Sequence, residues 1–282
     1  MTLRFACKQG RAHLVVGDDP LLVDLERASN GRFSSEPIAA FHRWDEVREF
    51  AASWTGGGEP VDLASLDAPS PWPTQVFGIG LNYRAHAEES GAPIPAVPLT
   101  FAKWTSSVAG PGAEIPIASG TVDWEVELVV VVGRGGRGIA EQDAWSHVAG
   151  LCVGQDISDR AIQFATQPPQ FGLGKSGRNF SPFGPWLTDA RDVADRDALT
   201  MSCTLNGEEV QRTCTDDLIF SVSRLVSYLS GIVQLLPGDA IFTGTPSGIG
   251  AVRKPPVWLK PGDVLVSTIE GLGSIVNRCT AG

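Results

Sequence analysis

The residues best suited to chemistry are acids that alternate along one apolar stretch, VDWEVELVVVVG. Alternate side chains of a β-strand share a face, so Asp123, Glu125 and Glu127 should point one way and the apolar residues between them the other. The Cα atoms of Glu125 and Glu127 would then lie about 6.6 Å apart. Two carboxylates this close repel unless a cation lies between them. A solvent-exposed acidic strand edge is the alternative, and the apolar residues that follow disfavour it because they predict a buried strand.

A third acid, Asp156, ends the apolar run GLCVG, where a predicted strand would deliver its side chain to a rim. A hard divalent cation prefers several oxygen ligands and keeps water or substrate oxygens in its remaining positions. Three carboxylates without an accompanying His or Cys indicate Mg²⁺ or Mn²⁺ rather than Zn²⁺. Ca²⁺ is a third hard ion that such oxygens accept.

A second constellation lies in GIGLNYRAHAEESG. If a helical turn follows Asn82, His86 and Glu89 stand at i and i+3 and can touch. A carboxylate that accepts from one imidazole nitrogen leaves the other free to take a proton from water, which is how a general base is assembled. Such a short, glycine-bounded segment could close over a site. An exposed His–Glu pair is the alternative interpretation.

Three further segments carry polar groups suited to an anionic substrate. Lys175 lies between glycines in GLGKSG, where an ammonium could neutralise a substrate or a developing enolate. Arg160 and Gln163 follow Asp156 at a spacing that suits one helical face, and could bind a carboxylate or carbonyl. The turn TGTPSGIG offers backbone amides and the Thr245 hydroxyl to an anion. Solvated loop charges and an ordinary glycine-rich turn are the alternatives.

One motif points to a different class of protein. Gly133, Gly135 and Gly138 spell GxGxxG after a predicted strand, with an acid, Asp156, about 20 residues on, as in dinucleotide-binding proteins. The preceding strand carries acids on one face, whereas the first strand of such a fold is apolar on both. No series of alternating strands and helices follows, so the sequence disfavours nucleotide binding.

The elements that would position these residues are mostly short strands. Many short runs rich in Val and Ile, separated by 32 glycines and 20 prolines, are typical of a β-rich protein. Helices are predicted at 43–54 and at 216–230, the second with Gly231 as its C-cap. LLPGDAIFTG and WLKPGDVLVSTIEG echo each other 24 residues apart and predict paired Pro-Gly turns that feed strands. A turn-rich stretch at 68–72 predicts a domain boundary.

Composition limits the partners. The chain has 282 residues with 22 basic and 32 acidic side chains, a net charge of −10, which argues against a nucleic acid or anionic membrane as partner. No apolar run reaches the length of a membrane helix. The first twenty residues lack a secretory signal pattern, so a cytoplasmic location is expected. The five cysteines show no metal-type pairing and predict free thiols.

Taken together, the motifs resemble those of the fumarylacetoacetate hydrolase family. The similarity runs from about Phe77 to Arg278, and several blocks in the expected order are far more specific than any one of them. These blocks are GLNYRAHAEESG, FAKWTSSVAGPG, VDWEVEL, QDISDRAIQ, GKS with FGPWL, LNGEEVQ, LLPGDAIFTGTPSGIG and IEGLGSIVN.

The resemblance implies a role for each candidate residue and a fold. The metal ligands would be Glu125, Glu127 and Asp156, the lid-borne dyad His86 and Glu89, the positioner of substrate or enolate Lys175, and the substrate contacts Arg160, Gln163 and Thr245. The implied fold is mostly β with some α (α+β), with a barrel-like, mixed β-sandwich roll as the large domain. We expect a small N-terminal α+β domain over 1–70, a catalytic domain over 71–282, and a homodimer.

The implied activity is metal-dependent hydrolysis of a carbon–carbon bond in a 2,4-dioxo acid, with release of pyruvate and a carboxylic acid. An acylpyruvate, a fumarylpyruvate or a sugar-derived dioxo acid would be the small-molecule substrate. Oxaloacetate decarboxylation, or isomerisation, dehydration or tautomerisation of a related oxo acid, needs the same site and is the alternative. In the loop GKSGRNFSPFGP the chain departs from many members, which have an acid and a threonine there, so the resemblance leaves the substrate open. A binding module without turnover would not need both His86 and Glu89.

Overall fold

The computed structural model describes residues 2–282, and over these residues the fold is mostly β with mixed sheets, as predicted, but without a closed barrel. The larger sheet has 11 strands. In spatial order its main path runs through β4 (Glu59–Pro60), β3 (Leu21–Asp24), β2 (Arg11–Val16), β1 (Arg4–Lys8), β13 (Ser181–Asp189), β11 (Val148–Gln155), β10 (Val126–Val132), β16 (Ala240–Phe242), β5 (Val76–Gly80) and β6 (Leu99–Lys103), while β7 (Val108–Ala109) pairs with β13.

A smaller sheet packs against this one. Its 5 strands, in spatial order, are β15 (Glu208–Cys214), β14 (Thr200–Leu205), β17 (Val264–Ile269), β18 (Gly273–Ala281) and β8 (Ile115–Ile117). The short strands β9 (Val122–Asp123) and β12 (Ser158–Asp159) form a separate antiparallel pair. Strands β14, β17 and β18 lie over β10, β11 and β13, which gives the β-sandwich that the sequence predicts.

Strand β10 is buried on both faces. Leu128 and Val130 belong to the core shared with the smaller sheet, whereas Val129 and Val131 belong to a second core shared with the N-terminal strands and helices. Because neither face meets solvent, the strand needs apolar residues at nearly every position. Glu127, only 1% exposed, therefore does not lie on a solvent-exposed acidic edge.

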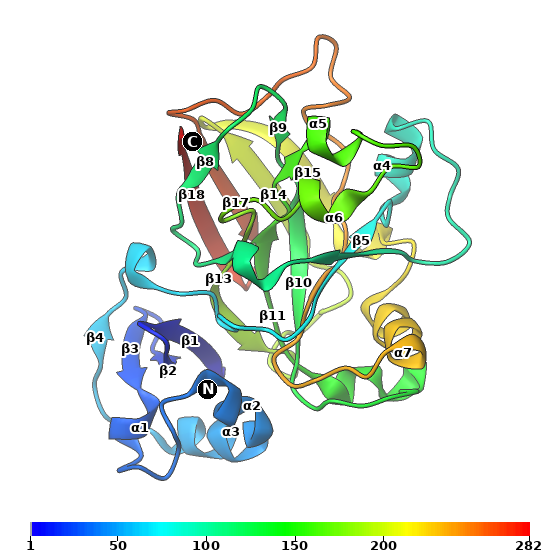
Figure 1. Ribbon diagram of the computed structural model, residues 1–282. Coiled ribbons are helices and arrows are strands. Elements are labelled where there is room, and N and C mark those ends of the chain that lie inside the picture. The colour runs from blue at the N-terminus through cyan, green and yellow to red at the C-terminus, as the bar shows by residue number, and fades with distance from the viewer. Residues whose placement is uncertain (1) are drawn as a thin grey trace.

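The N-terminal segment adds four strands, β1 to β4, to the larger sheet and also contains three helices. The helices are α1 (Leu25–Ala28), α2 (Pro37–His42) and α3 (Trp44–Ser53), and α3 confirms the helix predicted at 43–54. Strand β1 pairs with β13, and the indole N–H of Trp44 donates to Asp189 at 3.0 Å, so this segment is joined to the rest of the sheet (Figure 1). The division into domains at residue 70 stays a prediction.

The second predicted helix was wrong at both ends. Helix α7 spans Val222–Ile232, because Thr215–Asp217 form a 3₁₀ turn (η4) and the Ser221 side chain caps the helix by accepting from the amide of Arg224. Gly231 lies inside the helix instead of ending it. The remaining 3₁₀ turns are η1 (Leu63–Ser65), η2 (Thr105–Ser107) and η3 (Glu141–His147).

Both Pro-Gly turns are present as predicted. Gly238 and Gly262 have φ of 85° and 95°, and β16 and β17 follow them directly. The GxGxxG segment, by contrast, joins β10 to its antiparallel neighbour β11 through η3. A dinucleotide-binding loop joins a strand to a helix and a parallel strand, so this topology argues against the nucleotide-binding interpretation.

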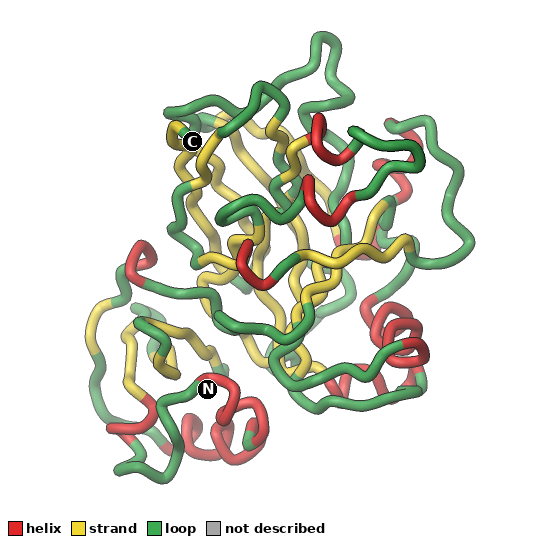
Figure 2. Tube along the Cα trace, in the orientation of Figure 1, coloured by secondary structure: helices red, strands yellow, loops and turns green. Residues whose placement is uncertain are grey.

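Three short helices gather at one end of the sheets. They are α4 (Arg84–Glu89), α5 (Arg160–Gln163) and α6 (Phe171–Gly174), at the upper right of Figure 1, and Figure 2 shows the loops next to them, of which 164–170 joins α5 to α6. Asn82 anchors the start of α4, since its side-chain amide donates to the carbonyl of Thr243 at 2.7 Å and its oxygen accepts from the amide of Phe220 at 2.8 Å. Among the described residues, no helix combines the length and apolarity that crossing a membrane requires.

Candidate metal centre and active site

Three carboxylates converge where β10 and β11 run side by side. Glu125 precedes β10, Glu127 lies in it, and Asp156 directly follows β11. The amide of Asp156 donates to the carbonyl of Glu125 at 2.9 Å, which holds the two segments together. One oxygen from each of the three acids lies within 4.8 Å of the others, and all three residues are buried. The structure thus brings together the three acids in which the sequence predicted a metal site.

Buried cations surround two of these carboxylates. The Lys175 ammonium lies 2.7 Å from Glu125 Oε2 and 2.7 Å from Asp156 Oδ2, and it also donates to the Ser158 hydroxyl at 2.8 Å. Burial alone would lower the pKa of Lys175, but the Asp156 and Glu125 carboxylates outweigh it and raise that pKa. Burial likewise opposes ionisation of Glu125, yet Lys175 and Arg160 lower its pKa to about 2. Glu125 and Lys175 are therefore both charged at neutral pH.

Lys103 is a second buried lysine at this site, and the sequence analysis overlooked it. Its ammonium lies 2.5 Å from Asp156 Oδ1 and also donates to the carbonyl of Lys175. Burial lowers the pKa of Lys103, although Asp156 acts against that effect. Lys103 is the last residue of β6, in the sequence FAKW. A lysine at the end of an apolar strand was the feature of the sequence that could have indicated a buried cation here.

Glu127 has no cationic partner. Over residues 2–282 it forms no ion pair, and the amide of Gly244 donates to its Oε2 at 2.8 Å. Burial, followed by the charges of Asp156 and Glu125, raises the pKa of Glu127 well above its usual range. A divalent cation among the three acids would relieve this repulsion, and all-oxygen donors suit Mg²⁺ or Mn²⁺. The donor set and its uncompensated charge therefore fit a divalent metal ion.

The His86–Glu89 pair forms within α4 as predicted. Because a carboxylate only accepts, His86 Nδ1–H donates to Glu89 Oε1 at 2.8 Å. The amide of Gly248 donates to the same carboxylate at 2.9 Å, so Glu89 connects α4 to the loop over 243–250. His86 is only 7% exposed and lines a cavity, which excludes the interpretation as an exposed ion pair. The remaining nitrogen, Nε2, accepts no hydrogen bond from any described residue and is available to take a proton.

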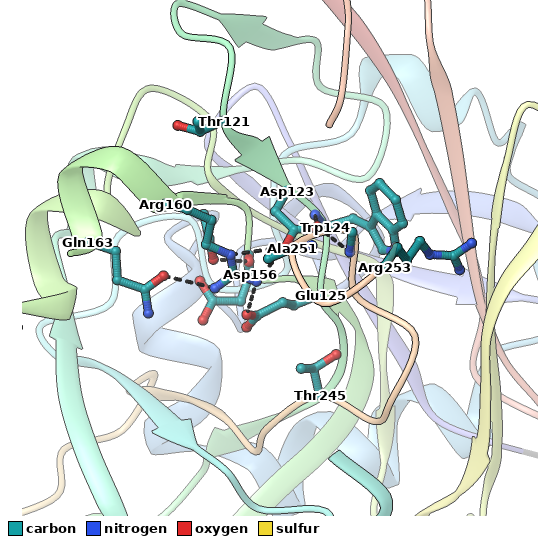
Figure 3. Close-up of polar contacts among 12 residues, drawn as sticks. Thr121, Asp123, Trp124, Glu125, Asp156, Arg160, Gln163, Thr245, Ala251 and Arg253 are labelled. Atoms are coloured by element: carbon teal, nitrogen blue, oxygen red, sulfur yellow. Dashed lines mark hydrogen bonds and ion pairs between the residues drawn. The ribbon is translucent and has the colours of Figure 1, made fainter. Parts of the chain in front are cut away.

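Arg160 and Gln163 lie together on α5, as their spacing predicted. Arg160 donates to Asp123 and Glu125, each at 2.7 Å, and to Gln163 Oε1 at 2.8 Å (Figure 3). Asp123 was expected to share a face with Glu125 and Glu127, but it lies outside the metal cluster and pairs with Arg160. A local alternation pattern could not show this, because Arg160 comes from a segment 37 residues further along the chain.

The loop over 243–250 binds anions, but these anions are carboxylates of the protein itself. The amides of Gly244, Gly248 and Gly250 donate to Glu127, Glu89 and Asp123, respectively. The Thr245 hydroxyl donates to the carbonyl of Val126 at 3.0 Å and accepts from Gln211 at 2.9 Å. Thr245 lines the cavity as expected, with both of these interactions already made inside the protein.

These side chains share one cavity of about 350 Å³. Its lining includes six of the nine residues predicted from the sequence. The other three are acids, of which Glu89 and Asp156 contact the lining residues His86 and Lys175. The six are His86, Glu125, Arg160, Gln163, Lys175 and Thr245. A cavity of this size holds a small molecule. The arrangement places the His86 imidazole and a cluster of buried charges in the same cavity.

Comparison with known proteins agrees with this site. The family model described as fumarylacetoacetate (FAA) hydrolase C-terminal matches residues 75–280. A putative HpcE protein from Mycobacterium smegmatis is 46% identical with a TM-score of 0.93, and the match covers 99% of each chain. Human oxaloacetate tautomerase FAHD2B, mitochondrial, is 44% identical over 221 residues, 78% of this chain and 70% of that protein.

Fumarylpyruvate hydrolase from Pseudomonas aeruginosa, solved in complex with Mn²⁺ and pyruvate, is similar at 34% identity and a TM-score of 0.67. That match covers 74% of this chain and 91% of the other. The human and Pseudomonas proteins are named for two different reactions, tautomerisation of oxaloacetate and hydrolysis of fumarylpyruvate. The family match spans nearly all of the chain beyond the N-terminal strands and helices, including every residue of the site described above. The chain belongs to the fumarylacetoacetate hydrolase family.

Proposed function

We propose that this protein is a divalent-metal-dependent hydrolase that cleaves a carbon–carbon bond in a 2,4-dioxo acid and releases pyruvate and a carboxylic acid. The observation that carries the proposal is His86, which is hydrogen-bonded to Glu89 and lines the same 350 Å³ cavity as Glu125. A base oriented in this way can activate water next to a cluster of buried carboxylates. The Mn²⁺ and pyruvate bound to the Pseudomonas relative support the choice of metal class and product.

In this reaction His86 Nε2 takes a proton from water, and the resulting hydroxide adds to the 4-oxo carbon of the substrate. The bond between C3 and C4 then breaks, its electron pair passes to C3 as an enolate of pyruvate, and the proton on His86 returns to C3. When bound, Mg²⁺ or Mn²⁺ supplies Lewis-acid stabilisation of the negative charge on the oxo acid. Glu89 stabilises the charged imidazole, and Arg160 with Gln163 offers N–H donors to the substrate.

A second candidate is keto–enol tautomerisation of an oxo acid such as oxaloacetate. The human relative that is 44% identical is named an oxaloacetate tautomerase. Tautomerisation needs His86 only to move a proton between C3 and the oxo oxygen, without an attacking water. Oxaloacetate decarboxylation, which also needs no attacking water, is a third outcome at the same residues.

A substrate panel separates these reactions. Acylpyruvates, oxaloacetate and sugar-derived dioxo acids are incubated with Mg²⁺, Mn²⁺ or chelator, and pyruvate release and enol absorbance are followed separately. The hydrolase proposal expects metal-dependent pyruvate and carboxylate from an acylpyruvate. Glu125→Ala should abolish that turnover, and His86→Ala should remove it while metal binding persists. Full hydrolytic rate in His86→Ala would refute the assignment of the base. The expected homodimer and cytoplasmic location stay predictions.

A further inference from the structure

The cavity continues from the buried charges to solvent along a row of aromatic rings. The Lys175 ammonium lies 5.1 Å from the centre of the Phe101 ring. The Phe101 ring lies 5.7 Å from that of Phe171, which in turn lies 6.0 Å from that of Phe164. All three phenylalanines line the cavity, and Phe164, the outermost, is 53% exposed. A ligand that extends from the charged end toward solvent therefore passes along an aromatic wall.

The cations at the charged end have little capacity left for a ligand. The three donors of the Lys175 ammonium are already used by Glu125, Asp156 and Ser158. Arg160 has five N–H groups. Three donate to Asp123 and Glu125 and one donates to Gln163, so one N–H on Nη1 is left for a ligand. That N–H and the side-chain amide of Gln163 are enough to bind one carboxylate. They do not supply a cation for a second carboxylate further along the cavity.

The Phe101 ring of the aromatic wall packs against the backbone of the neighbouring strand. A Cβ atom at Gly78 would come within 2.2 Å of the Phe101 ring, so this ring lies directly on the backbone of β5. Ile249, only 5% exposed, also lines the cavity. Among the lining residues that the structure describes, His86, Glu125, Arg160 and Lys175 carry the ionisable groups. Lys175 is the cation next to the Phe101 ring, and its three donors are already engaged.

We propose that the substrate carries an uncharged, apolar group beyond its dioxo-acid head, as in an alkanoyl- or aroylpyruvate, and that Phe164 at the mouth helps to select it. The inference rests on the proposed function, whose substrate class it narrows. Dicarboxylic acids are disfavoured, because their second carboxylate would lose its hydration next to the phenylalanine rings and find no cation there to pair with. The cost of moving an unpaired carboxylate out of water is larger than that of moving a neutral polar group, because the charge itself loses its hydration.

The first test compares two substrates that differ at one end. Pentanoylpyruvate and glutarylpyruvate share an eight-carbon chain that ends in a methyl group or a carboxylate, respectively. We expect kcat/KM for the methyl-ended acid to be higher by about tenfold or more in the wild-type protein with Mn²⁺. Equal rates, or a preference for glutarylpyruvate, would overturn the inference while the proposed function stands.

The second test introduces a positive charge into the aromatic wall at residue 164. Phe164→Arg places a cation at the mouth, and we expect it to reduce the preference for the methyl-ended acid by about tenfold. Ile162→Arg is the matched control, because Ile162 is 50% exposed, lies two residues away and does not line the cavity. The ratio of the two substrates within one variant cancels differences in folding or metal content. An equal change of this ratio in both variants would show that Phe164 has no selective role.

A binding measurement decides the inference even if neither acid is hydrolysed. Phenylpyruvate and 2-oxoglutarate, which carry one and two carboxylates, are titrated by calorimetry into the protein with Mn²⁺. Tighter binding of phenylpyruvate by about tenfold would support the apolar subsite although the hydrolase proposal had failed. Binding of 2-oxoglutarate that is as tight or tighter would overturn it.

Discussion

The orientation of His86 by Glu89 is open to a direct test, because Glu89→Gln changes charge and donor pattern with almost no change in shape. The Glu89 carboxylate faces two donors, His86 Nδ1–H at 2.8 Å and the amide of Gly248 at 2.9 Å. A glutamine has one accepting oxygen and one donating NH₂, so its NH₂ must face one of these groups. If it faces Nδ1, the imidazole takes the other tautomer and Nε2 carries the proton. His86 is then unable to act as a base toward the cavity.

The expected loss follows from that change. General-base catalysis contributes about 10²–10⁴ in rate, and we expect kcat of Glu89→Gln to fall by about 10² or more. One charge-assisted hydrogen bond is also weakened, which costs about 1.5–3 kcal/mol of folding free energy. Mn²⁺ affinity should be unchanged, since Glu89 lies outside the group of Glu125, Glu127 and Asp156.

The assay is steady-state kinetics on an acylpyruvate, with Mn²⁺ binding measured by calorimetry on the same preparations. Glu88→Gln is the matched control, because Glu88 is the preceding residue of α4 and is exposed. This control removes the same charge from the same helix and should keep kcat within about twofold. Equal kcat in Glu89→Gln and the wild type would refute the claim that His86 needs the Glu89 carboxylate, rather than any accepting oxygen at that position, to act as a base.

Three further predictions concern the metal site, a buried ion pair and pH. Mn²⁺ at about 100 times its Kd should stabilise the fold by about 2.7 kcal/mol and raise Tm by several degrees, a shift that Glu125→Ala should remove. Asp123→Ala leaves the buried Arg160 guanidinium short of a partner and should cost about 3–5 kcal/mol, measured by urea unfolding. Burial raises the pKa of Asp192, but Arg48 outweighs it, and the net pKa lies below 3.8. This contact therefore stabilises above that pH and is lost as pH falls through the lower folded pKa, so the Tm difference between the wild type and Arg48→Ala should shrink in acid.

Much of the site was predictable because its residues lie in short, regular segments. The alternation at 123–127 and the apolar run before residue 156 together placed three acids at the ends of neighbouring buried strands. The i and i+3 spacings of His86 with Glu89, and of Arg160 with Gln163, required only one helical turn each, and both pairs are hydrogen-bonded. Such patterns depend on local geometry, which the sequence expresses directly.

The sequence was less informative where distant segments meet. Lys103 contacts Asp156 across 53 positions, and the amide of Gly248 contacts Glu89 across 159. No periodicity marks such contacts, since they depend on which strands are neighbours in the sheet. The glycine-rich loop at 243–250 was expected to offer its amides to an anion, yet nothing local could show that carboxylates of the protein already accept from them. The start of α7 was missed for a smaller reason, because the apolar stripe begins before Ser221, the residue that caps the helix.

The three acids of VDWEVE show why the number of acids does not by itself locate a metal ion. Asp123 is neutralised by Arg160 and accepts from the amide of Gly250. Glu125 lies against Arg160 and Lys175, and its pKa falls to about 2. Glu127 is as deeply buried as either but pairs with no cation of the described chain, and its pKa rises. The alternation pattern alone predicts the same environment for all three acids. Their environments differ because the cations of the protein do not reach them equally. The side of Glu127, which no cation of the described chain reaches, is therefore where a divalent ion fits this cluster.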